Sequence, residues 1–162
     1  MQFVNPSHML RQAQNGRYAV PALNTNGANY DIARAALEAA NEARSPLILQ
    51  AYEPNCAYRG YGYFASMATF LADELNVDVP LALQLDHGHS FDSVVSAMHA
   101  GFSAVMFDAS HEPLQENIAK TREVLRVAQA VDAAVEGEVG YVKGNEPKPE
   151  KQIGRVPVPD SP

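Results

Sequence analysis

The sequence contains a single cysteine, Cys56, and no tryptophan among its 162 residues. One cysteine cannot form a disulfide within the chain, which favours a reducing compartment. Basic residues are also few, since 12 Lys and Arg stand against 19 Asp and Glu, and the formal net charge is −7. An acidic chain without a basic cluster has no electrostatic attraction for nucleic acid or for an anionic membrane surface, so we expect neither partner.

Long apolar runs are missing as well. No stretch reaches the roughly 20 residues that a transmembrane helix requires. Residues 1–8 lack a basic segment followed by an apolar one, so we expect no signal peptide. Hydrophobic residues still make up 46% of the chain, which is enough for one domain with a sizeable core. These features predict a globular, cytoplasmic protein.

Short apolar runs alternate with longer amphipathic segments along the chain. The short runs predict strands at residues 18–23, 47–51, 81–89, 103–107 and 133–139. The amphipathic segments predict helices at residues 6–14, 30–43 and 64–75, and two more that start near residues 91 and 113. Glycine and tyrosine dominate residues 52–63, which we expect to form a loop.

Each of these helices has a predicted apolar face. In the helix at 30–43, the residues expected to face the core are Ile32, Ala36, Ala39, Ala40 and Ala43. In the helix that starts near 113, they are Leu114, Ile118, Leu125 and Ala128.

The strand–helix rhythm predicts an α/β protein with a parallel sheet, because each unit has the length of a βα repeat. Two architectures fit this rhythm. An open doubly wound sheet is usually accompanied by a glycine-rich phosphate turn after its first strand, but the sequence there is Asn24-Thr-Asn-Gly27. A (β/α)₈ barrel needs about 250 residues, so only part of one would be present. Residues 143–162 are rich in Pro, Lys and Glu, and we expect a loop or flexible tail.

Polar side chains occur where each predicted strand ends. They are Asn24, Gln50, Asp86 with His87, Asp108, and Glu136 with Glu138. Because the carboxyl ends of parallel strands share one edge of the sheet, we expect these groups to gather there. A divalent metal would relieve the repulsion among the carboxylates and use the imidazole as a ligand. Turn formation, a solvated edge and a hydrogen-bonded structural histidine are the simpler alternatives.

Four segments resemble one enzyme family in order and spacing. They are Leu85-Asp-His-Gly88, Gly101-Phe-Ser-Ala-Val-Met-Phe-Asp-Ala-Ser110, Glu116-Asn-Ile-Ala-Lys-Thr121 and Val135-Glu-Gly-Glu-Val-Gly140. They resemble the class II, zinc-dependent ketose-bisphosphate aldolases, which include fructose- and tagatose-bisphosphate aldolases. The resemblance runs from about residue 3 to residue 146. It implies a (β/α)₈ TIM barrel, here about its first five strands and four helices, and we assign residues 1–142 to this partial barrel domain.

The resemblance also implies an activity and an assembly. Such enzymes catalyse the reversible aldol reaction that joins dihydroxyacetone phosphate and an aldehyde into a phosphorylated ketose. They belong to carbohydrate metabolism and glycolysis, which is consistent with a cytoplasmic location. The implied partner is the phosphorylated sugar substrate, and the implied state is a homo-oligomer, either a dimer or a tetramer.

Individual residues take roles from the matching motif positions. His87 resembles one of three zinc-binding histidines, and Asp86 the acid that exchanges a proton with the aldehyde oxygen. Asp108 and Glu138 resemble carboxylates of a neighbouring or alternate metal position, so a second divalent or monovalent cation fits the pattern beside Zn²⁺. Glu146 resembles a loop glutamate that shuttles a proton at the dihydroxyacetone carbon. Asn24 and Gln50 match polar residues that line the substrate site in the family.

The sequence departs from the family pattern in three places. The two other zinc histidines lie on later strands in the family, so we expect the isolated 162-residue chain to be nearly inactive. Tyr52 stands where many members have a serine that contacts phosphate, and Asn145 replaces an acidic neighbour of Glu146. Two alternatives therefore stand beside the aldolase: a non-catalytic half-barrel for binding or assembly, and a metal-dependent barrel lyase or hydrolase with a non-bisphosphate substrate.

Overall fold

A five-stranded parallel sheet forms the centre of the computed structural model, which describes residues 3–140. The strands are β1 (Ala22–Asn24), β2 (Leu47–Tyr52), β3 (Leu81–Gly88), β4 (Ala104–Phe107) and β5 (Ala134–Gly137). Each strand pairs in parallel with the next one along the chain, so spatial order follows sequence order. A doubly wound sheet reverses direction at a switch point, whereas a barrel does not. The α/β class is confirmed, and the topology is that of a partial barrel.

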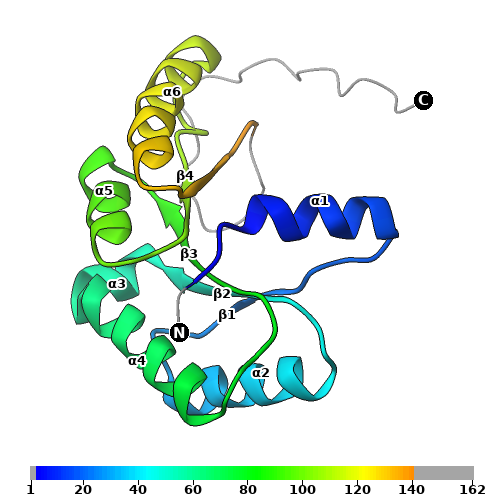
Figure 1. The fold of residues 1–162 in the computed structure, drawn as a ribbon. Coiled ribbons are helices and arrows are strands. Elements are labelled where there is room, and N and C mark those ends of the chain that lie inside the picture. The colour runs from blue at the N-terminus through cyan, green and yellow to red at the C-terminus, as the bar shows by residue number, and fades with distance from the viewer. Residues whose placement is uncertain (1–2, 141–162) are drawn as a thin grey trace.

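Five helices cover one face of this sheet and one helix lies against the other (Figure 1). The covering helices are α2 (Tyr30–Glu42), α3 (Glu53–Arg59), α4 (Tyr61–Glu74), α5 (Phe91–His99) and α6 (Leu114–Ala130). Their buried side chains pack with alternate strand residues such as Leu49, Leu83 and Val105 in one continuous core. None of the described helices is long and apolar enough to cross a bilayer.

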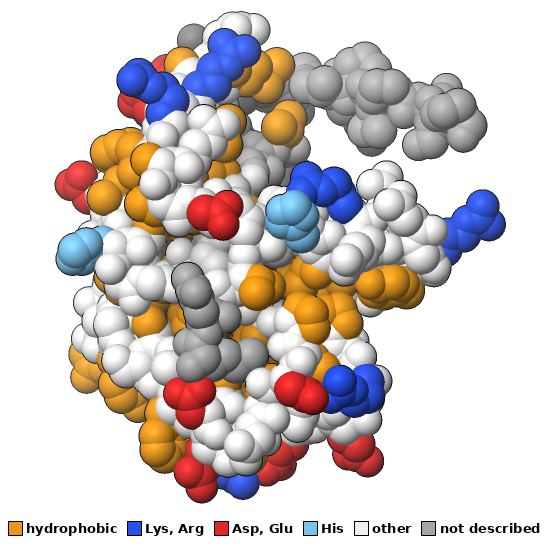
Figure 2. Space-filling view, in the orientation of Figure 1, with side chains coloured by type: hydrophobic (Ala, Val, Ile, Leu, Met, Phe, Trp, Pro, Cys, Tyr) orange, Lys and Arg blue, Asp and Glu red, His pale blue; other side chains and the backbone are white. Residues whose placement is uncertain are grey.

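Helix α1 (Pro6–Gly16) lies on the concave face, on the inner side of the partial barrel. Its Met9 packs with Ile48 and Ala82 in a second, smaller apolar cluster. In the space-filling view, further hydrophobic side chains are exposed beside α1 (Figure 2). The helix therefore covers the sheet near the amino ends of β2 and β3 and leaves their carboxyl ends open.

The side chains of β2 and β3 on the concave face form three layers of paired residues. Ile48 pairs with Ala82, Gln50 with Gln84, and Tyr52 with Asp86. Because side chains alternate between the two faces of a strand, these three pairs point to the same side. The layers change from apolar, under α1, to amide and then to acidic and aromatic at the carboxyl rim.

The prediction of a loop at residues 52–63 was wrong. Helix α3 begins there with Glu53 and Pro54 in its first turn, which are both favourable at a helix start. Gly60, at φ 91°, separates α3 from α4. Gly60 therefore marks a break between two helices rather than part of an extended loop.

The first predicted strand, at residues 18–23, was too long. Regular pairing covers only Ala22–Asn24, although the carbonyl of Pro21 still accepts from the Ile48 amide at 3.0 Å. Proline has no amide hydrogen and cannot donate to the ladder. At the other edge, β5 ends at Gly137, so Glu138 follows the strand instead of lying within it.

The core faces predicted for α2 and α6 needed correction. Ile32, Ala39 and Ala43 are exposed, while Ala33 and Leu37 are fully buried beside Ala36 and Ala40. In α6, Val124 is buried in the core and its neighbour Leu125 is exposed. An alanine-rich helix has little apolar contrast, and a shift of one position rotates the predicted face by about 100°.

Candidate metal centre

Residues from three strand ends meet at the carboxyl rim of the sheet. Asp86 and His87 belong to the end of β3, Asp108 follows β4 and Glu138 follows β5. Simple alternation would place Asp86 and His87 on opposite faces. Instead, the β3–β4 register shifts between Leu85 and Gly88, and His87 has a left-handed backbone with φ 52°. This bulge lets both side chains lie near the same carboxylates.

Gly88 allows this bulge to pack closely. A Cβ atom at this position would lie 2.6 Å from Cγ1 of Val94 and 2.9 Å from the carbonyl oxygen of Met106. Only a residue without a side chain fits between β4 and α5 here. The Asp-His-Gly sequence is therefore matched to the local geometry as well as to the chemistry.

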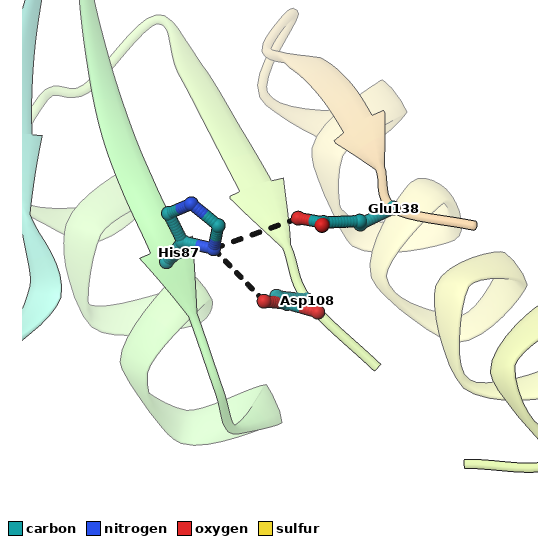
Figure 3. Close-up of side chains that lie close together, drawn as sticks. All are labelled: His87, Asp108 and Glu138. Carbon is teal, nitrogen blue, oxygen red and sulfur yellow. Dashed lines mark hydrogen bonds and ion pairs between the residues drawn. The ribbon is translucent and has the colours of Figure 1, made fainter. Parts of the chain in front are cut away.

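The imidazole of His87 lies among the carboxylates (Figure 3). Its Nδ1 is 2.8 Å from Oδ2 of Asp108 and 3.6 Å from Oε2 of Glu138. Its Nε2 is 4.0 Å from Oδ1 of Asp86. Asp108 is buried, whereas the other three residues are partly accessible. The candidate site is therefore a partly accessible cluster of three carboxylates around the imidazole of His87.

Neighbouring amides donate hydrogen bonds to the carboxylates of Asp86 and Asp108 and to the main chain of Glu138. Asn24 Nδ2 donates to Oδ2 of Asp86 at 3.0 Å, and the amide of Ser110 donates to Oδ1 of Asp108 at 2.9 Å. Asn117 Nδ2, on α6, donates to the main-chain carbonyl of Glu138 at 2.8 Å. Each of the three acidic residues is therefore held by a hydrogen bond from outside the cluster.

The surroundings shift the pKa values of His87 and Asp108 in opposite directions. Burial lowers the pKa of His87, but the hydrogen bond to Asp108 and the nearby negative charges outweigh it, so the pKa is raised. Burial likewise raises the pKa of Asp108, but the hydrogen bonds from Ser110 and the contact with His87 outweigh it, so that pKa is lowered. Without a cation, the two groups favour an imidazolium–carboxylate pair.

The donor set fits a divalent cation. His87, Asp108 and Glu138 each offer one ligand atom, and these atoms lie within 4.8 Å of one another. One imidazole nitrogen and two carboxylate oxygens are ligands that zinc accepts. A cation and a proton would compete for the same nitrogen of His87. The histidine therefore either forms the hydrogen bond to Asp108 or binds the cation, with the same neighbouring residues in both cases.

The other predicted site residues lie at different distances from this cluster. Gln50 is one layer below the rim and donates to Gln84, so the structure does not bring it to His87. Glu136 also bonds to Gln84 rather than to the histidine. Tyr52 is closer, with its ring centroid 6.3 Å from that of His87 in an edge-on arrangement. Glu146 lies outside the described residues, as does the predicted tail at 143–162.

Sequence reasoning missed two residues near the site, Asn117 and Gln84. Asn117 is buried on α6, next to the predicted core residue Ile118, and its hydroxyl neighbour Thr121 donates to its Oδ1 at 3.1 Å. Gln84 interrupts an apolar strand two positions before Asp86. In the sequence, each of these two residues is an isolated amide side chain at a position where an apolar core residue is expected, and this could have identified both.

Comparison with known proteins agrees with this geometry. The family model described as "Fructose-bisphosphate aldolase class-II" matches residues 4–157. Fructose-bisphosphate aldolase from Mycoplasma genitalium is 44% identical over 144 residues, which are 88% of this chain and 49% of that protein. The 6-phospho-5-dehydro-2-deoxy-D-gluconate aldolase from Bacillus licheniformis is 42% identical over 147 residues, covering 90% and 50%. The chain spans about half the length of the curated relatives it matches.

Solved structures give the same result. The YdjI aldolase from Escherichia coli K12 matches with a TM-score of 0.77 and 27% identity, over 86% of this chain and 52% of that one. The fructose-bisphosphate aldolase from Campylobacter jejuni matches with a TM-score of 0.73 and 25% identity, over 90% and 49%. With the rim of acidic residues around His87, these matches show that the chain belongs to the class II fructose-bisphosphate aldolase family.

Proposed function

We propose that this chain contributes the first half of an aldolase barrel and, at its carboxyl rim, part of a zinc-dependent site for a ketose phosphate. The observation that supports this most is the convergence of Asp86, His87, Asp108 and Glu138 from three strand ends. The proposed reaction is reversible aldol cleavage to dihydroxyacetone phosphate and an aldehyde, in the cytoplasm. The relatives' names support a phosphorylated sugar as substrate.

His87 is the proposed zinc ligand, with Asp108 and Glu138 as ligands of the same ion or of a second cation. Zinc, when bound, supplies Lewis-acid polarisation of the substrate carbonyl. The remaining steps belong to side chains. Asp86 is oriented by the Asn24 amide and exchanges a proton with the aldehyde oxygen. Glu146 is the proposed proton carrier at the dihydroxyacetone carbon, and Asn24 and Gln50 are the proposed polar contacts to substrate.

The metal assignment is tested by zinc content after dialysis. We expect the parent chain to retain zinc and His87→Ala to lose most of it, because the variant removes the only imidazole in the described ligand group. His99→Ala is the matched control, since His99 is an exposed histidine at the end of α5. Equal zinc content in the two variants would contradict the assignment.

We further propose that the 162-residue chain alone has little aldolase activity, because one imidazole leaves the catalytic zinc set short of ligands. The assay is zinc-dependent cleavage of fructose 1,6-bisphosphate by the purified chain. Zinc-dependent turnover by the parent chain would refute this proposal, provided that His87→Ala shows no turnover under the same conditions.

A second candidate is a lyase or hydrolase on the same barrel whose substrate has no phosphate near β2. Tyr52 favours it, because the tyrosine lies in the same layer as Asp86 and stands edge-on to His87. The adjoining start of α3 is a poor anion site, since Glu53 is acidic and Pro54 has no amide hydrogen. We expect the zinc-loaded chain to bind fructose 1-phosphate at least as tightly as fructose 1,6-bisphosphate in calorimetry.

Tyr52→Ser should shift that preference toward the bisphosphate by removing the ring. Tyr58→Ser is the control, because Tyr58 lies in α3, close to Tyr52 in sequence, and is 89% exposed. A parent chain that already prefers the bisphosphate would favour the ordinary aldolase substrate.

A third candidate is assembly. Within residues 3–140, β1 and β5 each pair with only one strand, so each has an open edge. Open edges favour association, and we propose that the chain forms a homo-oligomer, a dimer or tetramer, or joins a chain that completes the barrel. A compact monomer in size-exclusion chromatography across a range of concentrations would count against it.

A further inference from the structure

A hydrogen-bonded ladder of side chains lies on the concave face, one layer below the candidate metal centre. Gln50 Nε2 donates to Oε1 of Gln84 at 3.1 Å, and Gln84 Nε2 donates to Oε2 of Glu136 at 2.6 Å. Gln84 is 5% exposed. An amide buried to this extent is costly unless both of its ends are bonded, and here both are.

The ladder connects strands that are not neighbours. Gln84 is on β3 and Glu136 on β5, and β4 runs between them. The register partner of Gln84 on β4 is Ala104, whose side chain is only a methyl group. The long amide therefore reaches across β4, and one side chain joins β2, β3 and β5.

The same strands carry the proposed ligands. Glu138 is two residues after Glu136, and His87 is three residues after Gln84. No backbone hydrogen bonds join β3 to β5 in the sheet, yet His87 Nδ1 and Oε2 of Glu138 lie 3.6 Å apart. The separation of these two ligand atoms therefore depends on whatever fixes β5 relative to β3.

We propose that Gln84 is a positioning residue of the metal centre: its hydrogen bonds to Gln50 and Glu136 hold Glu138 within reach of His87. The inference rests on the proposed metal function and adds residues that do not themselves contact the ion. Partners that orient metal ligands typically contribute 10–100-fold to metal affinity.

A matched pair of variants at Glu136 isolates the Gln84–Glu136 hydrogen bond. Glu136→Gln and Glu136→Met remove the same charge, but only glutamine keeps an oxygen that accepts from Gln84. The affinity of the full 162-residue chain for Co²⁺ is measured by absorbance titration at fixed pH. We expect Glu136→Met to bind Co²⁺ about tenfold more weakly than Glu136→Gln. Because Glu136 is exposed, these variants put the fold at little risk.

Gln84→Met tests the ladder from its buried member, and it should weaken Co²⁺ binding by a similar factor. Ser103→Ala is the structural control. The Ser103 hydroxyl accepts from the Leu83 amide at 3.1 Å, so the variant loses a buried hydrogen bond between β3 and β4 without touching the ladder. We expect it to lower stability toward urea while its Co²⁺ affinity stays at the parental value.

Each contrary result has a separate meaning. Equal affinities for Glu136→Met and Glu136→Gln would overturn the positioning role, as would an equal loss in Ser103→Ala and Gln84→Met. If the parent chain itself bound no Co²⁺, the proposed metal centre would fail and this inference with it. If the parent chain bound Co²⁺ and the variants without the Gln84–Glu136 hydrogen bond bound it equally well, only the role of Gln84 would be refuted. The proposed metal centre would stand.

Discussion

His87 has a backbone conformation that few non-glycine residues adopt, with φ 52°. Such a conformation costs on the order of 1 kcal/mol or more and persists where the surroundings enforce it. Here the β3–β4 register shift and the hydrogen bond to Asp108 hold the residue in place. A strained residue whose ring lies among carboxylates is better explained by a use for that ring than by a gain in stability.

The opposite pKa shifts of His87 and Asp108 give the metal-free chain a defined pH dependence. The raised pKa of His87 contributes stability below the ordinary value of 6.5, and this is lost as pH rises through the raised pKa. The lowered pKa of Asp108 contributes stability above its ordinary value of 3.8, and this is lost as pH falls through the lowered pKa. The contact is therefore strongest between these two ordinary values.

We expect His87→Gln to be less stable than the parent chain by roughly 1 kcal/mol at a pH of about 5–6, in the presence of EDTA. The difference should shrink as the pH is raised toward about 8–9, because the imidazole of the parent becomes neutral. Urea unfolding at several pH values measures it. A difference that stays constant across this range would show that the charge on His87 contributes nothing.

Cys56 is the one thiol of the chain, and it is fully buried in α3. Burial, with a smaller contribution from the negative charge of Glu53, raises its pKa to about 12. Since the thiolate is the reactive form, we expect Ellman's reagent to label the folded chain at pH 8 at least tenfold more slowly than the chain in guanidinium. Rapid labelling without denaturant would mean that α3 opens readily.

At the scale of elements, Gly88 connects β3, β4 and α5. An alanine there would bring its Cβ within 2.6 Å of Val94 and 2.9 Å of a main-chain oxygen that cannot rotate away. We expect Gly88→Ala to lower the free energy of unfolding by about 1–3 kcal/mol. Thermal or urea unfolding measures this loss.

Gly62→Ala is the opposite case and serves as the control. Gly62 lies within α4, and a Cβ there would meet nothing within 4 Å. Replacing a helical glycine by alanine stabilises by about 0.5–1 kcal/mol. If both alanines destabilised the chain equally, close packing at Gly88 would not be the cause.

Strands β2, β3 and β4 were predicted more reliably than the core face of α2. β4 and the first three residues of β2 and of β3 are apolar on both faces, so the run itself marks the strand wherever its exact ends lie. In α2, by contrast, alanines occupy nearly every turn, and Ile32 was placed on the core face because it lies at helical spacing from Ala36, Ala39 and Ala40. Tertiary packing selected Leu37 instead, and composition alone could not show this.

At the scale of the whole molecule, the sequence likewise predicted only part of the site. The rim residues were predictable because strand ends in a parallel sheet converge whatever the register is. The Gln84–Glu136 hydrogen bond could not be predicted. It depends on the register of β3, β4 and β5 and on the small side chain of Ala104 in β4. Glu136 and Glu138 looked alike in sequence, but only the second lies beside His87.

A cation held by His87, Asp108 and Glu138 would connect the ends of three strands, so its effect should extend to the stability of the whole sheet. Ligand that binds only the folded state at 100 times its dissociation constant stabilises by about 2.7 kcal/mol. For a domain of this size that corresponds to a rise in Tm of roughly 5–10 °C. We expect zinc to produce such a shift in the parent chain, measured by circular dichroism.

The same shift should be nearly absent in Asp108→Asn, because the variant weakens both the ligand set and the orientation of His87. Asp92→Asn is the matched control, since Asp92 is an exposed acid in the first turn of α5 and belongs to no described ligand group. If zinc raised the Tm of both variants equally, the ion would be stabilising the chain from elsewhere. The three strand ends would then form a hydrogen-bonded cluster around His87, and the metal would have to be held by other residues.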